Sequence, residues 1–132
     1  MSGAAGPCGY EVAARPWPEI ADRFLEVVRS GQTWAQPIVD LIDQVVRSPH
    51  AGQLFASTSM HTLLVAGCTP FHTECAVLRI DYDADRDEFR LEYVEQPHVH
   101  TRWRKRCTPG EAFGGLEHLA RMKGWIQSHR AA

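Results

Sequence analysis

The chain has 132 residues, of which 44% are hydrophobic and 23% are charged, and its formal net charge is −2 at pH 7. This size and composition are typical of a single globular domain with its own core, and the small negative charge argues against nucleic acid or an anionic membrane as the main partner. The apolar runs are far shorter than the ~20 residues of a membrane-spanning helix, so we expect no membrane association.

Two helices are predicted near the N-terminus. The first begins at Pro18, because proline suits the first helical turn, and it ends near Gly31. The second begins near Pro37 and ends before Pro49, since a residue that precedes proline avoids the helical conformation. The short link between the two helices predicts that they pack as an antiparallel pair.

Residues 53–66 have the alternation of a β-strand, but neither alternate set is apolar over the whole length. We expect a bend or bulge near Ser59 that divides this stretch into two short strands. The alternative is one long strand with both of its faces partly covered.

The clearest pattern in the sequence lies in residues 75–94, where two strands are joined by an acidic turn at 83–87. A period of two places the apolar side chains of both strands on one face. These side chains are Leu78, Ile80, Tyr82, Phe89, Leu91 and Tyr93.

A final strand is predicted over residues 98–106, followed by a C-terminal helix. In the strand, one face carries His98, His100, Arg102 and Arg104, and the core-facing side carries Val99, Thr101 and Trp103. Thr108 and Glu111 form a capping box that starts the helix. Gly114 and Gly115 are unexpected within a helix. Either the helix begins after them, or another segment of backbone approaches closely there.

The order of these elements predicts an α+β fold. We expect two N-terminal helices, an antiparallel β-meander of four to five strands, and a C-terminal helix packed on one sheet face. Residues 1–15 are expected to form a flexible leader in which only the region near Tyr10 and Val12 is ordered, and residues 16–132 a single domain. This layout resembles that of several bacterial accessory and immunity-type proteins, at the level of the fold alone.

The N-terminal sequence has neither the basic region nor the apolar run of a secretory signal. We therefore expect a cytoplasmic protein whose four cysteines are reduced thiols. Cys107 lies after a basic run and just before a helix, and both features lower the pKa of reactive thiols. The alternative for Cys107 is an unreactive structural thiol.

A basic stretch at residues 102–106 is the first candidate binding site. Its arginines can bind phosphate groups or an acidic protein surface, or they can pair across strands with the acidic residues of the 75–94 hairpin. The candidate binding residues are His98, His100, Arg102, Arg104 and Arg106.

A histidine cluster is the second candidate. His98 and His100 are separated by one residue on a predicted strand, so both point to the same side, and His61 and His72 are candidate further metal ligands. The spacing matches no established zinc pattern. We therefore expect no metal and no cofactor, and the alternative is a metal site formed by these four histidines.

Motifs for dinucleotide, phosphate, zinc-protease and calcium sites do not occur in the sequence. The leading hypothesis is a non-enzymatic protein-interaction module, of the accessory or immunity type, that binds another protein or itself as a homodimer. We do not expect it to bind nucleic acid. The alternative is a small metal-binding protein or enzyme that uses a His cluster on the sheet.

Overall fold

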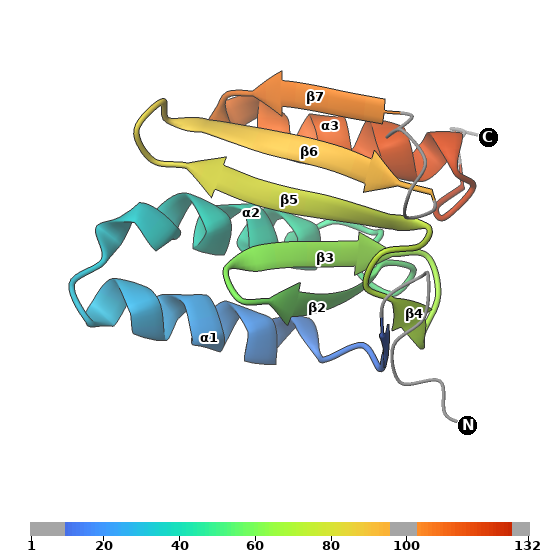
Figure 1. Ribbon diagram of the computed structural model, residues 1–132, viewed down its shortest axis with the longest axis horizontal. Helices are drawn as coiled ribbons and strands as arrows, with labels where there is room; N and C mark the ends of the chain where they lie inside the picture. The colour runs from blue at the N-terminus through green and yellow to red at the C-terminus, as the bar shows by residue number, and fades with distance from the viewer. Residues whose placement is uncertain (1–9, 96–102, 128–132) are drawn as a thin grey trace.

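The computed structural model describes residues 10–95 and 103–127. Within them, a five-stranded antiparallel sheet carries helices on one face, so the predicted α+β fold is confirmed (Figure 1). The strand order β2-β3-β5-β6-β7 is the expected meander. The elements, in chain order, are β1 (Glu11–Val12), α1 (Trp17–Arg29), the 3-10 helix η1 (Thr33–Ala35), α2 (Gln36–Arg47), β2 (Phe55–Ser59), β3 (Thr62–Ala66), β4 (Phe71–His72), β5 (Val77–Asp83), β6 (Glu88–Val94), β7 (Trp103–Cys107) and α3 (Pro109–Met122).

The helices α1 and α2 lie side by side and run in opposite directions, as predicted (Figure 1). Each has a proline in its first turn, where the missing N–H leaves no hydrogen bond unmade. Gly31 takes a φ of +102° just after α1, a conformation that glycine adopts without steric cost. The apolar stripes of both helices are buried against the sheet, through Ile20, Phe24, Ile38, Leu41, Ile42 and Val45.

The stretch 53–66 forms a hairpin rather than one strand, so the single-strand alternative is wrong. Ser59 pairs with Thr62, which leaves Met60 and His61 as a two-residue turn. Met60 has a φ of +56° and is one of the few large apolar side chains in the described residues that is strongly exposed. The break is therefore a tight turn and not the bulge that we considered.

The hairpin of β5 and β6 has its apolar side chains on one face, as the alternation predicts. Leu78 pairs with Tyr93, and Ile80 pairs with Leu91. These side chains and the helices form one core. The C-terminal helix α3 packs on the same face, and its N-terminus has the predicted capping box.

The glycine pair lies inside α3, which therefore does not begin after it. A Cβ atom at Gly114 would meet nothing within 4 Å. At Gly115 it would lie 3.2 Å from Leu91 Cδ2 and 3.4 Å from Lys105 Cδ. The close approach that we considered thus exists at Gly115, but it comes from side chains of β6 and β7 and not from backbone.

A second, smaller cluster lies on the sheet face opposite the helices. It contains Leu64, Ala66, Phe71 and Val77. Leu64 and Ala66 belong to it because they alternate along β3 with residues of the main core. The short sheet of β1 and β4 covers this end of the face.

One strand of this pairing, β1, lies within the segment predicted as a leader. Residues 10–15 fall within the predicted leader 1–15, yet they contain β1 and a backbone hydrogen bond of 2.9 Å from Arg15 N to Ala56 O. Residues 10–15 lie against the sheet because Val12 and Ala14 pack on the smaller cluster. The remainder of the predicted leader, residues 1–9, lies outside the described residues.

No helix in the described ranges is both long enough and apolar enough to cross a membrane.

The cysteines differ from expectation at one position. Cys68 and Cys107 are free, but Cys75 is disulfide-bonded, to a partner outside the described residues. The expectation that all four cysteines are reduced is therefore wrong for Cys75. The sequence could not reveal this, because disulfide pairing depends on the distance between residues in the folded chain.

Candidate functional site

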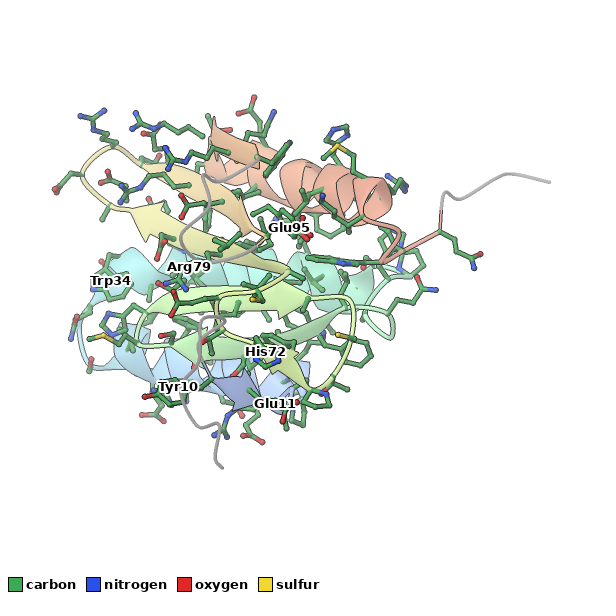
Figure 2. All side chains as sticks on the ribbon, turned by 45° about the vertical axis from the view of Figure 1, so that its right-hand side comes forward. Tyr10, Glu11, Trp34, His72, Arg79 and Glu95 are labelled. Atoms are coloured by element: carbon green, nitrogen blue, oxygen red, sulfur yellow. The ribbon has the colours of Figure 1, made fainter. Side chains whose placement is uncertain are left out.

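The sheet face opposite the helices is charged where the β1–β4 sheet does not cover it. Two rows of directly paired residues cross β5, β6 and β7. In the first row Arg90 lies between Asp81 and Arg106. In the second, Glu92 lies between Arg79 and Arg104. Figure 2 shows Arg79 on this face, among the charged side chains of the neighbouring strands.

These rows form a groove of about 490 Å³ that we call the β6–β7 groove. The groove has three arginine and two anionic side chains on the open face, although the whole chain has a net charge of −2. Its local charge is therefore opposite to that of the protein, and it attracts anions. The lining residues are Asp81, Arg90, Leu91, Glu92, Arg104, Lys105 and Arg106.

Cross-strand charge pairing, one of the two predicted uses of the basic stretch, is observed. Arg104 Nε lies 3.1 Å from Glu92 Oε2, whereas Arg106 makes only a long contact of 3.9 Å with Glu88. Both arginine side chains are well exposed, at 73% and 63%. Such exposed pairs stabilise a protein by at most about 1 kcal/mol, so the arginines keep most of their capacity to bind another anion.

Arg90 lies in the groove but is not among the predicted binding residues. It is exposed, and among the residues that the structure describes it has no hydrogen-bond or ion-pair partner. Asp81, directly opposite, accepts a hydrogen bond of 2.5 Å from Thr62 Oγ1. Arg106, on the other side, has the same charge as Arg90. The alternation of β6 predicts Arg90 on this face, but only the register reveals its neighbours.

The structure describes only part of the predicted binding set. Arg104 and Arg106 lie together on the open face of β7, while Trp103 packs toward the main core, as the alternation predicts. His98, His100 and Arg102 lie outside the described residues.

The two described members of the histidine set lie apart. The His61 ring stacks on Trp34 with 4.9 Å between ring centroids, whereas His72 lies in β4 and pairs with Glu11. Figure 2 shows Trp34 and His72 at separate places on the molecule. Within residues 10–95 and 103–127, no group of three or more His, Cys, Asp or Glu side chains is placed to hold a metal ion.

A buried histidine and a half-buried glutamate join the loop after α2 to α3. His50 Nε2 lies 2.8 Å from Glu117 Oε2, and Arg121 reaches the same oxygen at 3.4 Å. Burial raises the pKa of Glu117, but the hydrogen bond from His50 and the charge of Arg121 outweigh it and lower that pKa below its ordinary value. The sequence offers only the Glu117–Arg121 spacing of one helical turn as a signal. We interpret these contacts as structural, because they hold the loop after α2 against α3.

Cys107 fits the structural alternative. Its side chain is buried in the main core, and burial raises the pKa of its thiol despite the nearby Lys105. A raised pKa lowers the thiolate fraction, and the thiolate is the reactive form. The hypothesis of a reactive thiol at this position is therefore not supported.

Comparison of the chain with protein-family models, curated protein sequences and solved structures found no match. The interpretation of the groove therefore depends on its geometry and charge.

Proposed function

We propose that this protein is a non-enzymatic protein-interaction module, of the accessory or immunity type, whose partner presents acidic side chains to the β6–β7 groove. The observation that supports this function best is Arg90, a cation with no partner among the described residues, which lines a positively charged groove on a negatively charged chain. A planar guanidinium binds a carboxylate through two parallel hydrogen bonds, which gives both strength and orientation.

The pattern of charge favours a protein partner over nucleic acid. Asp81 and Glu92 lie within the groove, between its arginines. A continuous line of phosphates would meet these carboxylates as well as the cations, whereas a protein can place carboxylates only opposite the arginines. Such complementarity contributes to specificity and to the rate of association.

Two further expectations remain proposals. Self-association as a homodimer is tested by light scattering over a range of concentrations. A cytoplasmic location is tested by fractionation of cells, combined with thiol labelling of Cys75. The disulfide at Cys75 would be reduced in an ordinary cytoplasm, so labelling that finds it oxidised in cells would contradict the cytoplasmic proposal. Within the described residues, no observation favours the alternative of a His-based metal protein or enzyme.

The test is affinity capture with a charge-reversed groove. The variant R90E/R104E reverses two cations of the groove, and R23E/R29E makes the same charge change on the exposed side of α1. Circular dichroism checks that each variant is folded. Cross-linking and quantitative mass spectrometry then identify proteins that the wild type and R23E/R29E retain and that R90E/R104E loses.

The proposal predicts that these groove-dependent partners have acidic surfaces and are released by salt. It is overturned if both variants capture the same proteins as the wild type. It is also overturned if the groove-dependent material is removed by nucleases, because nucleic acid would then be the ligand.

A further inference from the structure

The strand β7 forms one edge of the five-stranded sheet, and no described strand pairs with its outer side (Figure 1). Its three central residues, Arg104, Lys105 and Arg106, are exposed. At the opposite edge, Arg15 N donates a hydrogen bond of 2.9 Å to Ala56 O of β2. A free edge presents backbone N–H and C=O groups that can pair with another strand. β7 is thus the more accessible of the two edges.

We propose that β7 receives an extended acidic segment of the partner protein, which adds to the sheet as a further strand. This inference rests on the proposed function and specifies how the partner binds. Main-chain hydrogen bonds to a sheet edge supply affinity, and side chains at alternate positions supply specificity. The groove lies beside this edge, because Arg104 and Arg106 line it from β7.

The side chains of β7 define the sequence that the added strand should have. Arg104 and Arg106 lie on the open face, so the residues opposite them should be acidic. On the helix side, Trp103 and Cys107 pack in the main core and aliphatic carbons of Lys105 lie near Gly115, so the alternate positions should be apolar. An alternation of acidic and apolar residues meets both requirements.

Charge argues against a second copy of this chain at the same edge. An antiparallel pair of β7 strands centred on Lys105 would place lysine against lysine and Arg104 against Arg106 on both sides. Like charges directly opposite one another destabilise a strand pair. Basic side chains on edge strands are a common protection against self-pairing. Acidic residues opposite Arg104 and Arg106 convert those two positions into favourable pairs.

The arginines can accept a new carboxylate without losing their present contacts. Arg104 meets Glu92 through Nε, which leaves its two terminal nitrogens available among the described contacts. Arg106 is held only by the 3.9 Å contact to Glu88. The guanidinium group has five N–H donors, so one arginine can serve a carboxylate on each neighbouring strand.

The experiment uses three fluorescent peptides that have the same set of side chains and the same charge. The first alternates glutamate and valine, the second has the glutamates and valines in two blocks, and the third has the alternating sequence with methylated backbone nitrogens. Fluorescence anisotropy at low salt measures their binding to the full chain. Hydrogen exchange then measures the protection of the β7 amides in each mixture.

The inference predicts that the alternating peptide binds roughly tenfold or more tightly than the other two. Only this peptide can form several backbone hydrogen bonds to β7 and place its glutamates opposite the arginines at the same time. It also predicts that this peptide protects the amides of β7, and that R104E/R106E abolishes its binding whereas R23E/R29E retains it.

Equal binding of the block or methylated peptide would overturn strand addition and leave the acidic-partner proposal intact. If none of the three peptides binds, strand addition is likewise overturned. The capture experiment with R90E/R104E decides the broader proposal separately, because it does not depend on the conformation of the bound segment.

Discussion

The adjacent glycines of α3 offer a sharp test of how this helix packs on the sheet. Both lie in the helix interior, where replacing glycine with alanine gains about 0.5–1 kcal/mol. At Gly114 a Cβ atom meets nothing within 4 Å, so the variant G114A should be more stable than the wild type by about that amount.

At Gly115 the same gain is opposed by the sheet. The new Cβ would lie 3.2 Å from Cδ2 of Leu91, which is almost fully buried, and 3.4 Å from Cδ of Lys105, which can move aside. Overpacking a core costs about 1–3 kcal/mol, which exceeds the gain in helix propensity. We therefore expect G115A to be less stable than the wild type, by up to about 2 kcal/mol.

The assay is equilibrium unfolding in urea, followed by circular dichroism. The two variants should differ in the urea concentration at the midpoint of unfolding. The dependence of the unfolding free energy on urea concentration should be the same for both, because the area exposed on unfolding hardly changes. Shortening the neighbour, as in L91V/G115A, should recover part of the loss through a favourable coupling. If G115A is stabilised as much as G114A, the contact with Leu91 does not exist. If G114A is destabilised, the helix does not continue through residue 114.

Three other predictions concern single groups. The hydrogen bond that Tyr82 donates to Asp87, together with burial, raises the pKa of Tyr82 to about 12. An alkaline absorbance titration with Y82F as the blank should detect this, and D87N should return the pKa toward its ordinary value of about 10; an unchanged titration would contradict the assignment. Because the pKa of Glu117 is lowered, its stabilisation is present above the unfolded pKa and is lost as pH falls through the folded pKa. E117Q should therefore lower the free energy of unfolding by about 1–2 kcal/mol at neutral pH, with the difference shrinking below about pH 4, and a pH-independent difference would count against the ionic contribution. Finally, Cys68 is exposed and Cys107 is buried, so alkylation of the native protein followed by peptide mapping should label Cys68 first, and equal rates would be inconsistent with burial of Cys107.

Much of the fold could be predicted because its signals are local. The capping box of Thr108 and Glu111 acts within one helical turn, and the alternation of residues 75–94 assigns each side chain to a face whichever strand lies next to it. The two N-terminal helices begin at prolines and end near a glycine or a proline for the same kind of reason. The division of residues 53–66 into two strands was predicted, but the two-residue turn between them was not.

The candidate site was less predictable, since it depends on which strands become neighbours. The basic stretch identified Arg104 and Arg106, but nothing in the sequence near Arg90 indicates that it lies between Asp81 and Arg106. The contact between His50 and Glu117 joins residues 67 positions apart. The pairing of β1 with β4 likewise joins two strands of only two residues each.

The sequence by itself therefore determined the longer helices and strands and which side of each is apolar, because these properties arise from residues within a few positions of one another. Only the tertiary structure decided the register of the strands, the position of β7 at the edge of the sheet and the lack of a partner for Arg90 among the described residues. These follow from packing of the whole chain, in which a shift of one residue would turn every side chain of a strand to the other face.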